Sequence, residues 1–556
     1  MTPENSTSKV AIAFIFVGIV LFGASLNDPF HFDDTLILRD GNVTNPAQWF
    51  HFLNPLHLRQ LTFFSFYLSY MAGGENPLGF HIVNVVVHLA NAILLYYLLS
   101  QFLKHWVAVT AGAIFLVHPI QTEAVLYVYQ RSVLLACLFS LLSLIAFHKK
   151  KYWLAAICFV CAFESKESAI AVPIALALLF RHKSRWPLFA GSVAAGVGAL
   201  ALLLYSKNPT VGIAAARDTG AFAYLIAQCR VIYTYLRLLV WPYPQSLEYT
   251  FPPSPGVWVL LAEIAGIAAI AAAGLWMWRQ DRWKVFGLSI ISFFVLLAPT
   301  SSIVPSADAA FEHRLYLPML AFSVFAASAL ALLPRRTVLA VPVLAVLAVF
   351  TIQRANVWGS DVALWEDTVK KAPAKARAWF NLGGAHLKTN PERAAVAFNR
   401  ALELEPFFPA AYYNLGIIEQ GKGNAGRAIV YFQKAIEQDD TFWPAWNNMG
   451  NTFFTSGQRE RALTSFENTL RLNPHYWPAQ YNSAIVLFQS GRFEQAIPKL
   501  RIVLAWRPDF KEARYVLATC LSKTGQQTEA EQEWKQVREM SGQGYVPEPG
   551  MIAAPQ

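Results

Sequence analysis

Two adjacent acidic residues, Asp33 and Asp34, are the strongest candidates for chemistry in this chain of 556 residues. They close the run Phe30-His31-Phe32-Asp33-Asp34, a few residues beyond an apolar segment at 9–26. Two neighbouring carboxylates at an apolar boundary raise each other's pKa, so that one can act as a general base. The alternative is a solvated loop start, and the spacing alone does not decide between the two.

Other charged and polar side chains occur near the ends of later apolar segments. A charge inside a membrane segment costs about 2.5–3.5 kcal/mol on insertion scales, so Arg131 should face a polar cavity or a partner. Cations there suit a phosphate, and Lys166 and Arg314 are two further candidates, although interfacial Lys and Arg can also snorkel. The candidates for positioning a sugar or an acceptor are His57, Arg59, His118, Glu123, Glu167, Glu312 and His313. Of these, His57 and Arg59 are explained equally well as surface residues.

The composition places most of the chain in lipid. Hydrophobic residues make up 55% of it and the mean hydropathy is +0.35, which is too apolar for an ordinary soluble protein. Apolar segments recur as far as Gln353, and the remainder reads as amphipathic. The sequence predicts about eleven spans, at 9–26, 79–103, 106–118, 124–147, 152–163, 167–181, 186–205, 256–278, 284–299, 314–333 and 336–353.

Basic residues in short turns between these segments give the orientation, because the positive-inside rule makes such turns cytoplasmic. The turns contain Lys149–Lys151, Arg181/Lys183/Arg185, Arg279/Arg282/Lys284 and Arg335–Arg336. The stretch 223–241 is ambiguous, since Arg230 and Arg237 would share one helical face. Treating it as an interfacial helix keeps every basic turn inside. The acidic loops and the C-terminal part then lie on the non-cytoplasmic side.

The C-terminal part repeats with a period of 34 residues. The period relates small residues and large apolar residues in two series, Ala394, Ala428, Ala462, Ala496 and Ala530, and Phe398, Phe432, Phe466, Leu500 and Trp534. This period is that of tetratricopeptide repeats, in which pairs of helices stack into a solenoid with a concave face. Trp443, Trp446, Trp477 and Trp506 either pack the repeats or line a peptide-binding groove.

The sequence therefore predicts an all-α chain in four parts. These are a membrane domain at 1–353, a connecting helix at 354–375, about five tetratricopeptide repeats at 376–545 and a flexible tail at 546–556. Neither main part has a basic stripe for nucleic acid. A Gly-rich phosphate loop, a nucleophile elbow and a His-Glu-x-x-His motif are absent from the sequence, and no metal site is predicted.

Several motifs in the membrane part resemble those of the transmembrane-and-tetratricopeptide O-mannosyltransferases and their bacterial relatives. This family consists of C-type glycosyltransferases that take a sugar from a polyprenyl phosphate. Besides Arg131 and Lys166-Glu167, the motifs are Phe32-Asp33-Asp34 with Asn42, Arg59-x-Leu61-Thr62, Gly79-Phe80-His81-x-x-Asn84-x-x-x-His88-x-x-Asn91-Ala92, His118-Pro119-Ile120-Gln121-Thr122-Glu123-Ala124-Val125, and Glu312-His313-Arg314-Leu315-Tyr316-Leu317-Pro318. Their order, with the repeats behind them, makes the resemblance specific.

The resemblance implies an inverting transfer of mannose or another hexose to a protein hydroxyl. Asp33 would deprotonate the acceptor and Asp34 would orient it, although either could be the base. Arg131, Lys166 and Arg314 would stabilise the leaving phosphate, and Glu312 and His313 would bind the sugar or position Arg314. Two residues depart from the expected pattern. Gln60 replaces a proline after Arg59, and His313 separates Glu312 from Arg314.

The resemblance also implies the partners, which are membrane lipid, a lipid-linked sugar as donor, and a protein or peptide acceptor bound by the repeats. No soluble cofactor is implied, and the need for a divalent metal is left open. We expect a bacterial inner membrane with the repeats in the periplasm, or an endoplasmic reticulum membrane with the repeats in the lumen. Two other functions are weighed, a non-enzymatic scaffold that presents the array and a transferase acting on glycolipid or cell-wall glycan.

Overall fold

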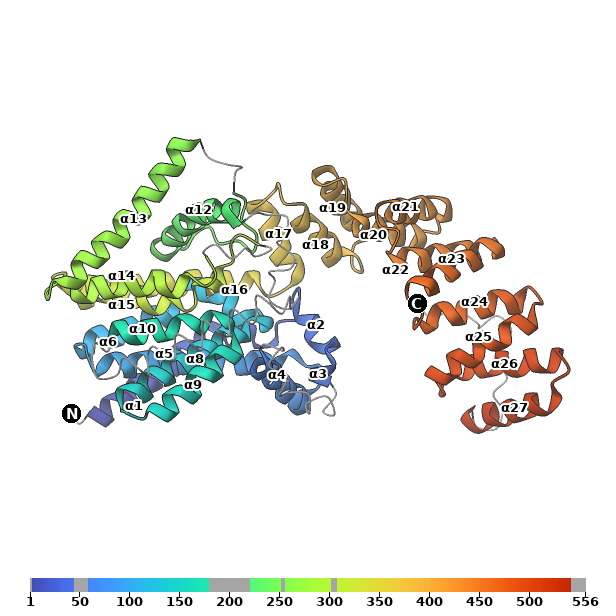
Figure 1. Cartoon of the computed structure of the whole chain (residues 1–556), viewed down its shortest axis with the longest axis horizontal. Coiled ribbons are helices and arrows are strands. Elements are labelled where there is room, and N and C mark those ends of the chain that lie inside the picture. The colour runs from blue at the N-terminus through green and yellow to red at the C-terminus, as the bar shows by residue number, and fades with distance from the viewer. Residues whose placement is uncertain (1–2, 45–58, 180–220, 252–255, 302–307, 542–556) are drawn as a thin grey trace. The chain divides into compact units, whose positions relative to one another are not determined.

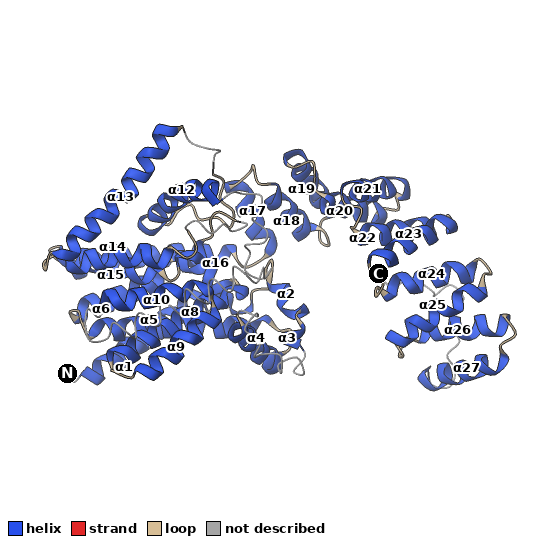
Figure 2. Cartoon of the chain, in the orientation of Figure 1, coloured by secondary structure: helices blue, strands red, loops and turns tan. Residues whose placement is uncertain are grey.

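The computed structural model describes residues 3–44, 59–179, 221–251, 256–301 and 308–541. Within these ranges the chain contains helices and no strand (Figure 2). It divides into two compact units, Met1–Ala372 and Pro373–Gln556. The prediction of an all-α chain with a membrane part and a repeat part is therefore confirmed.

The first unit is a bundle of apolar helices joined by short 3₁₀ turns (Figure 1). Its α-helices are α1 (Pro3–Phe22), α2 (Asp34–Arg39), α3 (Gly41–Thr44), α4 (Gln60–Gly73), α5 (Pro77–Ser100), α6 (His105–Val117), α7 (Thr122–Leu126), α8 (Arg131–His148), α9 (Tyr152–Ser165), α10 (Val172–Leu179), α12 (Ala221–Val240), α13 (Val257–Arg279), α14 (Lys284–Leu297), α15 (Pro318–Leu332), α16 (Arg336–Val357) and α17 (Asp361–Lys371). The 3₁₀ turns are η1 (Ala24–Asn27), η3 (Pro119–Gln121), η4 (Val128–Gln130), η5 (Glu167–Ala171) and η9 (Glu312–Leu315).

Large apolar side chains cover the outside of this bundle. Phe16 on α1, Trp153 on α9, Trp258 on α13 and Val341 on α16 are each more than 60% exposed. Such a surface is stable in lipid and unfavourable in water. With its long apolar helices, the first unit is a multi-pass membrane domain.

By length and composition, five of the described helices can cross a membrane, or six if the bent pair His105–Val117 and Pro119–Leu126 is one span. Four shorter apolar helices lie where further spans are predicted. The count of eleven stays a prediction, and the span at 186–205 lies outside the described residues. Helix α12 meets the criteria for a crossing, so its interfacial placement also stays a prediction.

The polar motifs interrupt the helices. The predicted spans at 124–147, 167–181 and 314–333 include the motif residues, whereas α8, α10 and α15 begin only at Arg131, Val172 and Pro318. The preceding residues form α7 and the turns η4, η5 and η9. The predicted span 124–147 places Arg131 about two turns inside a helix. In the structure, Arg131 is instead the first residue of α8.

The segment predicted as one connecting helix, 354–375, is divided. Helix α16 ends at Val357, and α17 begins after Ser360, whose hydroxyl accepts a hydrogen bond from the Ala363 N–H at 3.2 Å. This N-cap starts a new helix. Helix α17 belongs to the first unit. The predicted tail at 546–556 lies outside the described residues.

In the second unit, the residues that the structure describes form five helical pairs. Its helices are α18 (Ala376–His386), α19 (Pro391–Leu404), α20 (Pro409–Gly421), α21 (Ala425–Gln438), α22 (Trp443–Thr455), α23 (Arg459–Leu472), α24 (Trp477–Gln489), α25 (Phe493–Trp506), α26 (Lys511–Lys523) and α27 (Gln527–Ser541). In the second pair, a Cβ on Gly416 would lie 2.5 Å from the Phe432 ring, so the repeating glycine and aromatic residue are complementary in size.

Candidate active site at the ends of the membrane helices

The acidic pair lies on a loop that is anchored by Asp34. Asp34 is fully buried, and its carboxylate accepts hydrogen bonds from three backbone N–H groups. These donors are Tyr129 at 2.7 Å, His31 at 3.1 Å and Val128 at 3.3 Å. Burial raises the pKa of Asp34 to about 7, although these bonds lower it. The predicted role of orienting the acceptor does not fit this burial, and the contacts make Asp34 a positioning residue.

Asp33 is the more accessible of the two carboxylates. The Tyr127 hydroxyl donates a hydrogen bond to Asp33 Oδ2 at 2.9 Å, and the Asp33 N–H donates to the Tyr127 oxygen at 3.3 Å. The residue before it, Phe32, has φ 49°, a left-handed conformation that is costly for an aromatic residue. Such strain persists only where surrounding contacts impose it, and it is frequent at functional sites.

Helix α17 holds the other side of the acid loop. Asp361 accepts from His31 Nδ1 at 2.7 Å, and the Trp365 ring lies 5.8 Å from the Phe32 ring in an edge-on contact. Trp365 is 3% exposed. The helix that sequence analysis assigned to the connector is therefore part of the site.

Replacing Trp365 with alanine tests this role of α17. We expect Trp365→Ala to destabilise the membrane unit by about 3–5 kcal/mol, because a large buried side chain is removed from beneath the acid loop. Thermal unfolding in detergent measures the effect. Lys370→Ala removes an exposed side chain from the same helix and is the control. Equal melting temperatures for both variants would show that α17 is only a tether.

A cluster of basic side chains lies on the other side of η4. Arg59 makes a two-point ion pair with Glu167, with N···O distances of 2.6 and 3.1 Å, and Lys166 Nζ donates to Gln130 Oε1 at 3.2 Å. Burial, together with the charges of Arg59 and Arg314, lowers the pKa of Lys166 to about 7, although Glu167 and Glu123 act in the opposite direction. The positive charges of Arg59 and Arg314 are thus close enough to disfavour the ammonium form of Lys166.

The turn η4 joins the two halves of the site. The N–H groups of Val128 and Tyr129 bind Asp34, and the Gln130 side chain binds Lys166. Three consecutive residues thereby hold the acid loop and the basic cluster at the same end of the bundle. The shared face that the sequence predicts for Asp33, Lys166 and Arg314 stays a prediction.

The Glu-His-Arg motif on η9 makes contacts that differ from residue to residue. His313 Nδ1 lies 2.5 Å from Glu123 Oε1, and the Glu312 N–H donates to Glu123 Oε2 at 2.9 Å. Burial lowers the pKa of His313, as do Lys166 and Arg314, so a neutral ring donates to Glu123. Arg314 donates to the carbonyls of Asp308 and Ala309 at 2.7 and 2.9 Å.

The Glu312 side chain is hydrogen-bonded by the segment 245–249, which sequence analysis did not single out. Its carboxylate accepts from the Gln245 side chain, the Ser246 N–H and the Tyr249 hydroxyl, and burial raises its pKa. Lys371 of α17 also donates to the Gln245 carbonyl at 2.6 Å. Glu312 therefore positions the site and is not open to a sugar. The only sequence signal was a polar Gln-Ser pair after Pro-Tyr-Pro, which is too common to be specific.

Two predicted ligands have structural roles. Arg131 is fully buried and donates to Asn84 Oδ1, the Ser65 carbonyl, Ser69 Oγ and the Phe80 carbonyl at 2.8–3.1 Å. Its guanidinium ties α4 and α5 to α8, so we reassign it from phosphate binding.

His118 is also fully engaged. Its Nδ1 accepts from the Ile120 N–H and its Nε2 lies 3.1 Å from the Leu239 carbonyl, so this neutral ring caps η3 and does not contact a sugar. His57 lies outside the described residues. Among the described residues, His, Cys, Asp and Glu nowhere form a group of three that could hold a metal ion.

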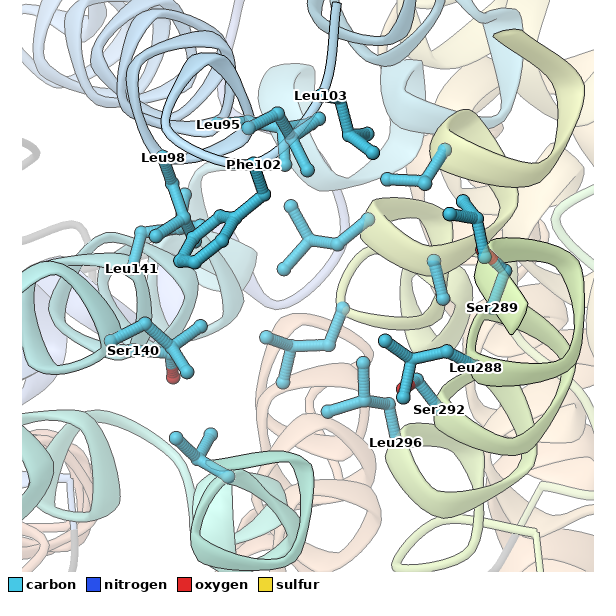
Figure 3. A pocket seen from close by; sticks show the side chains of 18 of the residues that line it. Leu95, Leu98, Phe102, Leu103, Ser140, Leu141, Leu288, Ser289, Ser292 and Leu296 are labelled. Carbon is cyan, nitrogen blue, oxygen red and sulfur yellow. The ribbon is translucent and has the colours of Figure 1, made fainter. Parts of the chain in front are cut away.

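An apolar cavity of ≈ 440 Å³ lies within the membrane unit (Figure 3). Leucine side chains from α5, α8 and α14 point into it. Val172 and Leu317 also line it, and they follow Lys166 and Arg314 in the chain by six and three residues. Lys284, at the start of α14, lines it as well. The cavity is thus lined by residues that follow both the Lys166 and the Arg314 motifs in the chain.

Comparison with known proteins supports the same division of the chain. Models of the tetratricopeptide repeat match residues 388–441, 447–503 and 487–543, which confirms the repeats. A crystal structure of YrrB, described as a TPR protein with an unusual peptide-binding site, covers 32% of this chain and 92% of its own, at 19% identity and a TM-score of 0.30.

The proteins of similar sequence are named protein O-mannosyl-transferase. The Caenorhabditis elegans protein O-mannosyl-transferase F38B6.6 is 27% identical over 353 residues, which cover 58% of this chain and 50% of that protein. Mouse protein O-mannosyl-transferase TMTC4 is 24% identical over 481 residues, covering 69% and 65%. The chain thus spans about half to two thirds of the length of these two relatives. The chain is a relative of the protein O-mannosyl-transferases and carries a tetratricopeptide-repeat unit at its C-terminus.

Proposed function

We propose that this chain is a membrane protein O-mannosyltransferase. It transfers mannose or another hexose from a polyprenyl-phosphate donor to a hydroxyl of a protein acceptor that the repeats recruit. The observation that carries the proposal is the arrangement around η4, with the Asp33 loop on one side and the basic cluster on the other. An apolar cavity within the same unit has a lining that suits an isoprenoid chain.

The proposed reaction needs one base and an anion site. The acceptor oxygen attacks the anomeric carbon of the sugar and forms the new glycosidic bond, while the bond from that carbon to the phosphate oxygen breaks. Asp33 takes the hydroxyl proton, and the polyprenyl phosphate leaves with the electron pair. Arg59, Lys166 and Arg314 supply positive charge where the leaving group becomes more negative, which lowers the barrier. The sugar is transferred with inversion.

The experiment that tests the function is a transfer assay with the purified full chain in detergent. The donor is polyprenyl-phosphate mannose, and the acceptor is a peptide rich in Ser and Thr. The expected product is a peptide heavier by one hexose, detected by mass spectrometry. Binding and consumption of the donor without peptide modification would favour a glycolipid or glycan acceptor. A chain that neither binds nor consumes the donor would support the scaffold function.

Lys166 gives this donor binding a predicted pH dependence. With a pKa of about 7 in the free protein, Lys166 is protonated below that pH and neutral above it. We expect donor affinity to be highest below pH 7 and to fall as the pH rises toward 9, because only the ammonium form attracts the phosphate. Lys166→Gln should weaken binding by about ten- to a hundredfold at pH 6 and flatten the profile.

Two controls make this prediction specific. Lys151→Gln removes an exposed lysine from the turn before α9 and should leave both the affinity and the profile unchanged. The melting temperature of Lys166→Gln should equal that of the wild type, because its charge is already disfavoured by burial. An unchanged pH profile in Lys166→Gln would exclude Lys166 as a phosphate ligand.

The proposed topology places the site and the repeats on the non-cytoplasmic side of a bacterial inner membrane or an endoplasmic reticulum membrane. Tyr243, which is 57% exposed, provides the test, because it lies beside the buried Gln245 of the site. In a background without the five native cysteines, Tyr243→Cys should react with an impermeant maleimide from the non-cytoplasmic side, and Lys149→Cys only from the cytoplasm. The reverse pattern would overturn the orientation.

A further inference from the structure

The hydroxyl of Tyr127 makes two hydrogen bonds, and both join it to Asp33. It accepts from the Asp33 N–H at 3.3 Å and donates to Asp33 Oδ2 at 2.9 Å. A phenol has a single proton. While the oxygen accepts from the Asp33 backbone, that proton is directed to the Asp33 carboxylate. Tyr127 therefore holds both the backbone and the side chain of Asp33 in one orientation.

The Tyr127 ring is itself held in place by its neighbours. It stacks on the Trp358 ring, with the ring centres 5.9 Å apart and an angle of 29° between the planes, and the Phe32 ring lies 6.3 Å away. Trp358 is 1% exposed and Tyr127 is 4% exposed. The Tyr127 N–H also donates to the Glu123 carbonyl at 3.1 Å. A ring enclosed in this way keeps its hydroxyl in one position, which gives the preorganisation that a reacting group needs.

Packing explains the ring of Tyr127 but not its hydroxyl. Phenylalanine would make the same ring contacts with Trp358 and Phe32 without bringing a polar atom into a buried position. A buried hydroxyl is tolerated where it is hydrogen-bonded, and here both bonds go to Asp33. Ionisation of the phenol would add a negative charge beside Asp33 and Asp34, which like-charge repulsion disfavours. The hydroxyl therefore remains a donor to the Asp33 carboxylate.

The contact between Tyr127 and Asp33 has two opposite effects on a general base. A hydrogen bond donated to a carboxylate favours its ionised form and so weakens it as a base. The same bond fixes where the carboxylate points, and a base must lie within about 2.6–3.2 Å of the group whose proton it takes. A displacement of about 1 Å can cost about a hundredfold in rate. Only part of a change in base strength appears in the rate of proton transfer, so the gain in orientation is the larger effect.

We propose that Tyr127 is a positioning residue for the transfer reaction, whose hydroxyl fixes the Asp33 carboxylate in the orientation that meets the acceptor hydroxyl. This proposal rests on the proposed function, because it concerns the base of that reaction. The turn η4 follows Tyr127 directly, and the N–H groups of Val128 and Tyr129 bind Asp34. One stretch of three residues thus sets both carboxylates of the acidic pair, Asp34 through the backbone and Asp33 through a phenol.

Tyr127→Phe tests this role, because it removes the hydroxyl and keeps the ring. The measured quantity is kcat/KM for the acceptor peptide at saturating donor, followed from acid to neutral pH with the full chain in detergent. We expect the rate to fall about ten- to a hundredfold. The acid limb of the profile should also move to higher pH by about one unit, because the base loses a donor that favours its ionised form. Donor affinity and the melting temperature should change little.

Two further variants make the result specific. Tyr70→Phe removes the hydroxyl of a half-buried tyrosine on α4 and should leave both the rate and the profile unchanged. The double variant Asp33→Asn with Tyr127→Phe should be no slower than Asp33→Asn alone, because a residue that acts through Asp33 then has no base to position.

The shift of the acid limb reports on the phenol, because Tyr127→Phe leaves the other charges around the acid loop in place. The titratable groups that it keeps include His31, Asp34, Asp40, Tyr129 and Asp361. A purely structural role for Tyr127 would change the stability or the rate at every pH and would not move the limb.

The outcomes separate this role from the proposed function. A wild type without transfer overturns the proposed function and the role of Tyr127 with it. If the wild type transfers, an unchanged acid limb in Tyr127→Phe, or a double variant much slower than Asp33→Asn, overturns only the role of Tyr127. If Tyr127→Phe melts early, 3-fluorotyrosine at the same position replaces it. Its phenol is the stronger donor, so the limb should then move to lower pH, and an unchanged limb would overturn the role.

Discussion

Asp33→Asn is expected to lower the rate of hexose transfer by about 10²–10⁴-fold, the usual contribution of a general base. The amide cannot take the proton of the acceptor hydroxyl. It can still accept the hydrogen bond that Tyr127 donates to Asp33 Oδ2, so the loop should keep its conformation. The transfer assay with purified protein measures the effect, and donor binding should change little.

Substitutions of two nearby carboxylates serve as controls for this result. Asp40→Asn changes an acidic residue at the end of α2 and should transfer at the wild-type rate. Asp34→Asn should instead lower the melting temperature, because an amide offers one oxygen where three backbone N–H groups now bind a carboxylate. Transfer at the wild-type rate by Asp33→Asn would exclude Asp33 as the base.

Arg131→Met is expected to be the most destabilising substitution in the membrane unit. The guanidinium binds acceptors on α4 and α5 from the start of α8, and it lies 4.6 Å from the centre of the Phe66 ring. Its removal leaves Asn84 Oδ1 without a donor, at about 1–3 kcal/mol for such a buried group, and it also removes the hydrogen bonds to Ser69 Oγ and to two helix carbonyls. We therefore expect a loss of at least about 3 kcal/mol in the free energy of unfolding, measured by thermal unfolding in detergent.

A positive charge alone should not restore the stability that is lost when Arg131 is replaced. Arg131→Lys keeps a cation, but one ammonium group cannot reproduce the fork that reaches Asn84, Ser69 and the Phe80 carbonyl together. Lys149→Met, at the other end of α8, is the matched control and should melt as the wild type does. A stable Arg131→Met variant that no longer binds the donor would restore the phosphate-binding role.

The candidate site contains residues that the sequence singled out and residues whose contacts it could not assign. Asp33, Lys166 and Arg314 were expected at one end of the bundle, and in the structure the Asp33-Asp34 loop and Lys166 both contact η4. The sequence also indicated that Arg131 needed a polar partner. Insertion cost requires a partner but does not distinguish a ligand phosphate from the protein's own carbonyl groups. That distinction depended on where α4 packs.

Three roles were decided by contacts between distant segments. Asp34 is bound by η4, 94 and 95 residues away, Glu312 by the segment at Gln245, 67 residues away, and His31 by Asp361, 330 residues away. A local pattern cannot show which backbone N–H groups will reach a carboxylate. The same limit applied to α17, whose amphipathic sequence fits a connector as well as a helix packed on the acid loop.

By itself, the sequence determined that the chain is helical, that its first part belongs in lipid and that its second part is a tetratricopeptide array. These properties follow from apolar length and from a 34-residue period, which are local and repeated signals. Only the tertiary structure decided which of two adjacent carboxylates is accessible and which arginine is used inside the bundle. Burial and hydrogen bonding depend on the neighbours that packing supplies, and these come from elsewhere in the chain.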